Sequence, residues 1–385
     1  MVHLLSSGEC FPMAAFSDVG AILQGVMSTP GPLEPQDLLE IANILQIAED
    51  VEKFLGSRKE RYPLLRAKLE GVELLPEIKR AIRGTIGPKG EVLDSASSTL
   101  KSLRSSFRSI KTRLKRALEE LMPGLDDVLQ EPLITLRRER YVLPLKPNFR
   151  RALEGIVHDR SASGGTLFVE PLSVCPLNNR LAELKREEEE EVYRILSSLT
   201  KEVMARREAL ELLSGRLAEL DAVFAKASYA REYKCHSPLI SQGGSISLKA
   251  VRHPLLLADG AVEEVVPIDI SLGDGYRQLL ITGPNTGGKT VALKTLGLSA
   301  LMAQAGVPIP AEEGSRLPLF RGVYADIGDE QSLQQSLSTF SGHMSNIVKI
   351  LSEAGGDSLV LLDELGAGTD PDEGAALGVA LLESL

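Results

Sequence analysis

Residues 281–294 read ITGPNTGGKTVALK, and this stretch decides the fold expected for the second half of the chain. Within it, residues 283–290 fit the pattern GxxxxGK[ST] of a phosphate-binding loop. The preceding residues 278–282 are predicted to form a strand, and residues 291–303 a helix. Glycines let the backbone wrap around a phosphate, while loop N–H groups and the helix N-terminus supply positive potential. The stretch therefore predicts a nucleotide-binding α/β domain.

The side chains of this loop have distinct predicted roles. Lys289 should reach the β- and γ-phosphates, and Thr290 should ligate Mg²⁺. The alternative, a chance glycine-rich turn, is disfavoured by the strand and helix expected on either side. The predicted ATP-binding residues of the loop are Gly283, Pro284, Asn285, Thr286, Gly287, Gly288, Lys289 and Thr290.

An apolar strand that ends in two acids follows later, where residues 359–364 read LVLLDE. Asp363 would hold Mg²⁺ through water, and Glu364 would polarise the attacking water. Apolar strands ending in acids are common, so this signal gains its weight from the phosphate-binding loop. The adjacent acids and the following GAGTDP (366–371) look like ABC-type ATPases, and the sequence has no NKxD-type guanine reader. ATP is therefore the expected nucleotide.

Composition narrows the class of protein further. The chain has 385 residues, 43% of them hydrophobic, and a net charge of −10. Its three cysteines have no CxxC spacing, which argues against a zinc site or a disulfide framework. No basic leader and no apolar run of about 20 residues is present, so we expect a cytoplasmic protein with no membrane partner. The acidic balance counts mildly against nucleic acid, although a binding face is local.

Hydrophobic periodicity organises the first part of the chain into helices and a strand-rich insertion. Residues 34–83 predict short helices with a break at Gly56, and residues 94–122 predict a long amphipathic helix. Residues 133–170 predict short strands. Residues 177–233 keep the helical period with Gly215 as the only internal weak point, and would span roughly 85 Å if unbroken. Together these segments predict an arm: an antiparallel helix pair with a small domain at its tip.

Several segments together resemble one known family. GPNTGGKT, DIGDEQSLQQSLSTFSGHM and LLDELGAGTDPDEG look like the MutS family, in its second bacterial branch (MutS-II, the endonuclease or recombination-suppressor type). GIVHDRSASGGTLFVEPLSVCPLNNRLAEL resembles the clamp and lever of that branch. The resemblance covers about residues 11–385.

The resemblance implies a homodimer with two composite ATP sites that use Mg²⁺, and levers and clamps that enclose nucleic acid. Residues 366–371 would cross the dimer interface. The second bacterial branch lacks the mismatch-reading domain of true MutS, and we likewise expect no such domain in this sequence. By motif position, the family's functional residues correspond to Asn285, Lys289 and Thr290 for nucleotide and metal, Ser338 in trans, Asp363 on the metal and Glu364 as catalytic base.

Together with the periodicity, the resemblance defines the expected fold class as multidomain, α plus α/β. The segment from residue 237 onward alternates strand-like and helical stretches, which predicts a mainly parallel sheet. The expected segments are a helical core (1–93), an outgoing lever helix (94–132), a clamp (133–176), a returning lever helix with part of the core (177–236), and an incomplete P-loop ATPase domain (237–385).

Basic residues of the arm are the candidate nucleic-acid contacts. Between residues 101 and 116 there are seven basic residues and no acidic one. Such side chains suit phosphate contacts, which give affinity without reading sequence. The alternative is a solvent-exposed basic face that balances the charge of the five glutamates at residues 187–191. Only the family resemblance favours nucleic-acid binding over this alternative. The candidates are Lys101, Arg104, Arg108, Lys111 and Lys115 on the helix, and Arg137, Arg138, Arg140, Lys146, Arg150 and Arg151 at the tip.

Some candidate residues keep two interpretations. Ser338 or Thr339 could cap a helix running to Ile350 instead of acting in trans. His253 and His343 are better explained as structural histidines. Asp326 and Asp329 could approach the metal or form turns, and neither is included in the predicted site.

The chain departs from the family pattern at both ends. The family's first helical segment is not found before Phe11, and the chain stops at Leu385, in the helix after GAGTDP. The switch histidine, the last strands of the ATPase and the Smr nuclease domain are therefore expected to be absent. Endonuclease activity would belong to that nuclease domain, and a fragment is expected.

Functions of different classes remain open on the sequence. One is an ATP-dependent clamp on branched or recombining DNA that suppresses homologous recombination. Another is a ribosome-collision sensor that grips rRNA or the ribosome and splits stalled ribosomes with the same ATPase. A third, an SMC-like coiled-coil ATPase, is disfavoured because its phosphate-binding loop would precede the coil, whereas here the arm precedes both motifs.

Overall fold

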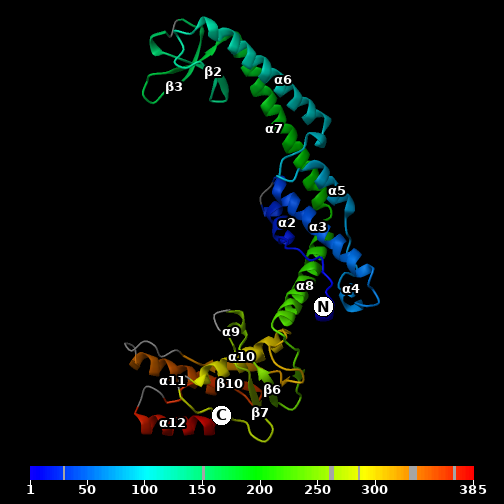
Figure 1. Cartoon of the computed structure of the whole chain (residues 1–385), viewed down its shortest axis with the longest axis vertical. Helices are drawn as coiled ribbons and strands as arrows, with labels where there is room; N and C mark the ends of the chain where they lie inside the picture. Colours follow the sequence, from blue (N-terminus) through cyan, green and yellow to red (C-terminus); the bar gives the residue numbers. More distant parts are fainter. Residues whose placement is uncertain (29–30, 150–151, 260–263, 285–286, 329–335, 367–369) are drawn as a thin grey trace. The chain divides into compact units, whose positions relative to one another are not determined.

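The computed structural model describes residues 1–385 except 29–30, 150–151, 260–263, 285–286, 329–335 and 367–369, and does not describe the side chains of 336–341 (Figure 1). Contacts within the chain divide it into two compact units. The arm unit is Pro12–Glu219, and the P-loop unit is Met1–Phe11 with Leu220–Leu385. The finer division into five segments stays a prediction.

The base of the arm unit is a small group of helices packed on α3. Leu38, Ile41 and Leu45 repeat at helical spacing along α3 and are fully buried, so this stripe supplies the local core. Proline opens α3, α4 and α5, where its missing N–H costs nothing. As predicted, α3 ends at Gly56. The helices are α2 (Val19–Ser28), α3 (Pro35–Gly56), α4 (Pro63–Ala67) and α5 (Pro76–Thr85).

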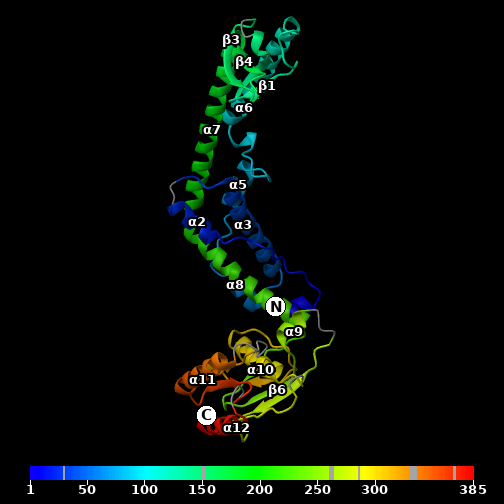
Figure 2. The same cartoon turned by 90° about the vertical axis from the view of Figure 1, so that its left-hand side faces the viewer.

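The arm itself is an antiparallel pair of helices, α6 (Ser98–Leu121) and α7 (Cys175–Met204), side by side in both Figure 1 and Figure 2. The hydroxyl of Ser97 caps α6 by accepting a hydrogen bond from the Leu100 N–H at 3.0 Å. Buried leucines at helical spacing form the seam between the helices. The predicted long amphipathic helix is confirmed from Ser98 onward, and the predicted first residues form a separate 3₁₀ turn (Asp94–Ala96) before the extended Ser97.

The returning helix is broken where the sequence did not indicate a break. It ends at Met204, and α8 (Arg207–Glu232) begins after a turn in which the Arg206 N–H donates to the Val203 carbonyl at 2.9 Å. The prediction of Gly215 as the weak point was wrong. Gly215 lies inside α8 between the buried Leu213 and Leu217, whose packing outweighs the roughly 1 kcal/mol that glycine costs in a helix. Within the described residues, no helix is long and apolar enough to cross a membrane.

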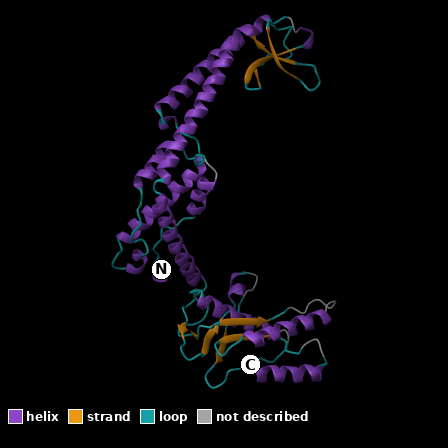
Figure 3. Ribbon diagram, turned by 180° about the vertical axis from the view of Figure 1, so that it is seen from behind, coloured by secondary structure: helices purple, strands orange, loops and turns teal. Residues whose placement is uncertain are grey.

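A small antiparallel sheet forms the tip of the arm (Figure 3). Leu143, Leu145 and Val169 point from it into a core shared with Leu114 and Leu118 of α6. The predicted strand-rich insertion is confirmed. Its strand order is β1-β2-β4-β3, with β1 (Thr135–Arg137), β2 (Arg140–Leu145), β3 (Gly155–Arg160) and β4 (Leu167–Pro171).

The described residues of the P-loop unit form two small sheets rather than one mainly parallel sheet. In the first, of order β5-β8-β6-β7, β6 pairs antiparallel with both neighbours. In the part of the chain that the structure describes, β9 and β10 form a parallel pair after the loop, and β5 and β8 pair parallel within the first sheet. The strands are β5 (Leu239–Ile240), β6 (Ile246–Val251), β7 (Ile268–Leu272), β8 (Arg316–Leu317), β9 (Gly322–Asp326) and β10 (Ser358–Leu362).

Helices pack around these strands. Leu296 and Ala300 of α10 lie in one apolar cluster with Leu359 and Leu361 of β10, so the helix after the loop is fixed against the acidic strand. The helices of this unit are α1 (Val2–Ser6), α9 (Pro254–Ala258), α10 (Lys289–Gln304), α11 (Ser336–Glu353) and α12 (Pro371–Ser384), with α8 entering it.

The strand predicted for residues 278–282 is not formed. This segment pairs with no other strand in the part of the chain that the structure describes, and Leu280 is 70% exposed. Apolar, β-branched composition favours a strand only where a partner strand and a buried face are present. The segment therefore leads into the loop without regular secondary structure.

Candidate nucleotide-binding site and basic arm

The phosphate-binding loop meets the first turn of α10. Lys289 opens the helix directly after Gly288, whose φ of +79° places it in the left-handed region that glycine adopts without steric cost. The Lys289 ammonium donates a hydrogen bond to the Gly283 carbonyl at 2.6 Å, which spans the loop. Gly283, Pro284 and Gly287 are exposed. The predicted Asn285 and Thr286 lie outside the described residues.

Two residues far apart in the sequence meet at the start of α10. The Thr290 hydroxyl donates to an oxygen of the Asp363 carboxylate at 2.5 Å, across 73 positions of sequence. Parallel pairing of β10 with β9 carries Asp363 to this point, because it is the first residue after β10. Hydroxyl and carboxylate oxygens are ligands that suit Mg²⁺, so these residues fit the metal that the motif implies.

Glu364, the predicted catalytic base, is exposed beside Asp363 with a φ of +50°. Few residues other than glycine adopt this conformation, and strained backbone of this kind clusters at functional sites. Its turn directs the chain out of β10 immediately after the predicted metal residue. The catalytic role of Glu364 stays a prediction.

Ser338 lies within α11, which begins two positions earlier at Ser336, so Ser338 is not the residue before the helix. Its side chain is outside the described part of the chain. Its role in trans therefore stays a prediction.

A buried acid that the predicted site omitted lies next to Asp363. Asp326, the last residue of β9, accepts hydrogen bonds from His343 and Asn346 of α11, and its main-chain carbonyl accepts from the Asp363 N–H. His343 therefore has a defined partner. Asn346 was not singled out from the sequence, although its spacing from His343 places both on one face of a helix.

His253 has a structural role in the described structure. Its ring accepts a hydrogen bond from the Leu256 N–H at 3.4 Å and so caps α9. Burial, and secondarily the charge of Lys294, lower the pKa of His253. This environment favours the neutral ring that a cap requires.

The candidate basic residues of α6 fall into two groups. Arg104 is 25% exposed and is held by Glu188 at 2.7 Å, by Asp94 at 2.7 Å and by the Val92 carbonyl. The contact with Glu188 ties α6 to α7, and the other two tie α6 to the segment that precedes it. Lys101, Arg108 and Lys115 are exposed, with Arg108 only 3.5 Å from Asp94, and Lys111 is half-buried.

The candidate residues at the tip show the same division. Arg137 stacks on Phe168, with its guanidinium 4.2 Å from the ring centroid, and Arg138 is exposed. Lys146 donates to the Asp127 carbonyl at 3.0 Å. Arg140 is bound to the buried Glu170. Arg150 and Arg151 are outside the described residues.

Glu170 is the centre of a buried polar network that joins the tip to α7. Its carboxylate is fully buried and accepts hydrogen bonds from Arg140 at 2.8 Å, Asn178 at 2.8 Å and His158 at 2.5 Å. His158 is the extra residue of a β-bulge in β3, which re-aims its side chain towards Glu170. These hydrogen bonds outweigh burial and lower the pKa of Glu170.

Asn178 also fixes the adjacent strand. Its amide accepts from the Tyr141 N–H and donates to the Tyr141 carbonyl, both at 3.1 Å. By extension of the β2–β4 register, Tyr141 would face Pro171, which has no N–H to donate. The Asn178 side chain therefore acts as the missing partner of β2.

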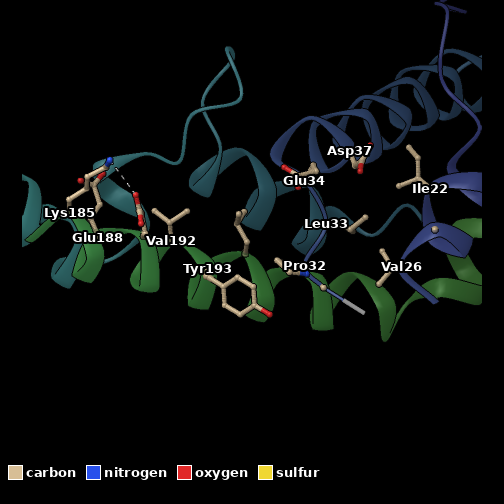
Figure 4. Close-up of a pocket in the computed structure, with 14 residues that line it drawn as sticks. Ile22, Val26, Pro32, Leu33, Glu34, Asp37, Lys185, Glu188, Val192 and Tyr193 are labelled. Atoms are coloured by element: carbon tan, nitrogen blue, oxygen red, sulfur yellow. Dashed lines mark ion pairs between the residues drawn. The ribbon is translucent and has the colours of Figure 1, made fainter. Parts of the chain in front are cut away.

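A groove of about 860 Å³ lies in the arm unit between α2 and α7 (Figure 4). The residues that line it include the apolar Ile22, Val26 and Val192 and the acidic Glu34 and Asp37. None of the predicted site residues lines it.

Comparison with known proteins agrees with these features. The model of MutS domain V matches residues 279–385. Endonuclease MutS2 of Geobacillus sp. (strain WCH70) is 48% identical over 379 residues, covering 97% of this chain and 48% of that protein. Endonuclease MutS2 of Pelotomaculum thermopropionicum is 49% identical over 355 residues, covering 92% of this chain and 45% of that protein.

The chain thus spans about half the length of the curated relatives that it matches. The match runs through the arm as well as the phosphate-binding loop, because it extends over more than nine-tenths of the chain. On this similarity, the chain belongs to the MutS family, in the branch of the proteins named endonuclease MutS2.

Proposed function

We propose that the chain is the ATP-binding and clamp-bearing part of a MutS-type nucleic-acid clamp. It binds ATP with Mg²⁺ at the start of α10 and grips branched or recombining DNA with the arm, as a homodimer that suppresses homologous recombination. The observation that carries the proposal is the 2.5 Å contact between Thr290 and Asp363, which gathers the two predicted metal residues beside Lys289.

The residues of the site have different roles in binding and hydrolysing the nucleotide. The Lys289 ammonium, which bonds to Gly283 across the loop, turns to the β- and γ-phosphates. Thr290 and Asp363 would hold Mg²⁺, which would supply positive charge to neutralise the phosphates. Glu364 orients and polarises the attacking water, and Ser338 acts on the partner's nucleotide.

The exposed cations of the arm supply the grip on nucleic acid. Lys101, Arg108 and Lys115 lie on α6 with solvent on their outer side, whereas Arg104 is engaged in contacts to α7. Contacts from such residues to phosphates give affinity that falls steeply with salt and does not depend on sequence. This pattern suits recognition of a shape such as a DNA junction.

A binding measurement with matched substrates tests the proposal. The chain is titrated into a labelled four-way junction and a linear duplex of the same length, at several salt concentrations, and is sedimented with stalled ribosomes at the same salt. We expect tighter binding to the junction, with a steep salt dependence. Co-sedimentation with ribosomes and no junction binding would replace the DNA clamp with a ribosome-splitting function.

A further inference from the structure

Asp326 is a buried carboxylate that the proposed ATP chemistry does not use directly. It ends β9 with 8% of its surface exposed. One carboxylate oxygen lies 2.9 Å from Nδ1 of His343, and the other accepts from the Asn346 amide at 2.9 Å. Both partners come from α11. A carboxylate can only accept, so Nδ1 of His343 carries the proton in this contact.

The main chain of Asp326 connects its side-chain contacts with α11 to the predicted metal residues. Its carbonyl accepts a hydrogen bond from the Asp363 N–H at 2.9 Å, and the Asp363 carboxylate accepts from Thr290 at 2.5 Å. A continuous path of hydrogen bonds therefore runs from α11 through the ends of β9 and β10 to the start of α10. It links the helix that carries Ser338 to the residues predicted to hold the metal.

We propose that His343 and Asn346 are positioning residues for the metal site. By holding both oxygens of Asp326, they fix the end of β9, and the Asp326 carbonyl in turn fixes the backbone at Asp363. The orientation of the Asp363 carboxylate towards the metal then depends on the position of α11. This inference rests on the proposed ATP function, because it assigns the metal to Thr290 and Asp363.

Electrostatics support the same assignment. A buried carboxylate without donors would be costly, and it would repel the neighbouring Asp363. The donors on α11 compensate the charge of the Asp326 carboxylate and hold it towards α11, while the Asp363 carboxylate meets Thr290. Residues that orient metal ligands in this indirect way commonly change metal affinity about 10- to 100-fold when they are mutated.

Variants of His343 separate positioning from a purely structural tie. His343→Asn keeps a donor at the position of Nδ1, His343→Gln moves the donor one bond farther out, and His343→Leu removes it. Lys349→Ala changes an exposed residue of the same helix and serves as the control. Each variant of the chain is titrated with Mn²⁺ in the presence of a non-hydrolysable ATP analogue, and free Mn²⁺ is followed by electron paramagnetic resonance.

We expect His343→Leu to weaken Mn²⁺ binding about 10-fold, while the affinity for the analogue without metal stays unchanged. His343→Asn and Lys349→Ala should bind Mn²⁺ as the wild type does. A His343→Leu chain with a lower thermal midpoint and unchanged Mn²⁺ affinity would overturn the inference. If His343→Leu does not fold, equal Mn²⁺ affinities for His343→Asn and His343→Gln would overturn it instead.

The wild-type titration distinguishes this inference from the function on which it rests. A wild-type chain that does not bind the analogue would overturn the proposed ATP site, and the positioning role with it. A wild-type chain that binds the analogue and Mn²⁺, with all His343 variants alike, would overturn only the positioning role.

Discussion

At the residue scale, the site shows how neighbouring acids acquire different environments. Asp363 is oriented by the ladder of β9 and β10 and meets Thr290, whereas Glu364 leaves the strand through a left-handed turn and is exposed. The first arrangement suits a fixed metal ligand. The second suits a side chain that must reach water on the open side of the site.

Substitutions at Lys289 and Glu364 should separate binding from chemistry. Lys289→Ala removes a charged donor worth about 1.5–3 kcal/mol, so ATP affinity should fall about 10-fold or more. Glu364→Gln keeps the shape of the side chain and should leave ATP bound, with a closed dimer trapped. Titration with a fluorescent ATP analogue and sedimentation velocity measure both effects. Equal ATP affinity in the two variants contradicts these roles.

The sequence predicts the residues of this site better than their surroundings. Lys289, Thr290 and Asp363 stand in motifs whose chemistry requires them to converge, and the structure brings Thr290 and Asp363 into contact. Asp326 opens the segment DIGDEQSLQQSLSTFSGHM, which makes it a candidate without indicating its partners, and Asn346 lies just beyond that segment. Their contact depends on the register of β9 against β10 and on the packing of α11, which are tertiary features that no local pattern encodes.

At the element scale, polar contacts hold the two helices of the arm together near its base. The Ser97 hydroxyl, which caps α6, also donates to Glu191 of α7 at 2.6 Å. Arg194 contacts the same carboxylate at 2.7 Å through two nitrogens. The start of α6 is therefore tied to the middle of α7 through one carboxylate.

Glu191 should make the stability of the arm depend on pH. Hydrogen bonds from Arg194 and then Ser97 lower the pKa of Glu191 to about 2. Its contribution is complete above the ordinary pKa of about 4.5 and is lost as the pH falls towards 2. Glu191→Gln should cost about 2 kcal/mol at pH 7, and less at pH 4.

Thermal unfolding of both chains at the two pH values measures this difference. The neighbouring exposed Glu190 is the control, and Glu190→Gln should change stability by less than about 0.5 kcal/mol. A destabilisation by Glu191→Gln that does not change with pH contradicts the proposed role of its charge.

Removal of Glu170 should destabilise the tip of the arm. Glu170→Ala leaves Arg140 and His158 without the buried carboxylate, and breaking a buried ion pair costs about 3–5 kcal/mol. Glu154→Ala, at an exposed position next to β3, should have little effect. Hydrogen exchange in β2 and β4 measures the loss, and unchanged protection there contradicts the prediction.

Periodicity predicts elements where burial on one face decides them. The helices α3 and α6 follow their leucine stripes, and the strands of the tip follow their β-branched runs. The break at residues 205–206 has no glycine or proline to mark it. The missing strand at 278–282 has the right composition but no partner, and pairing is not a local property.

At the scale of the whole molecule, the net charge of −10 conceals an uneven distribution. The basic residues of α6 and the glutamates of α7 lie on one pair of helices. Some of these residues form ion pairs between the two helices, as Arg104 and Glu188 do. Only the remaining cations face solvent. Total charge is therefore a poor guide to what the arm binds.

Salt dependence should identify the cations that contact nucleic acid. The double variant Lys101→Ala and Lys115→Ala should reduce the slope of log K against log salt by about 0.9 for each duplex phosphate that these lysines neutralise in the wild type. Arg104→Ala should instead lower the thermal midpoint of the arm. Anisotropy with a labelled junction gives the slope. An unchanged slope in the double variant would remove these lysines from the interface.

The double hydrogen bond between Asn178 and Tyr141 has a consequence for how this family can vary. Because Asn178 fixes the position of Tyr141 in β2, a one-residue insertion or deletion between Tyr141 and Leu145 would turn the inward side chains that follow it to the wrong face. Changes in the length of the loop between β2 and β3 do not alter the contact between Asn178 and Tyr141. Related chains should therefore differ in loop length after Leu145 while keeping the spacing inside β2 constant.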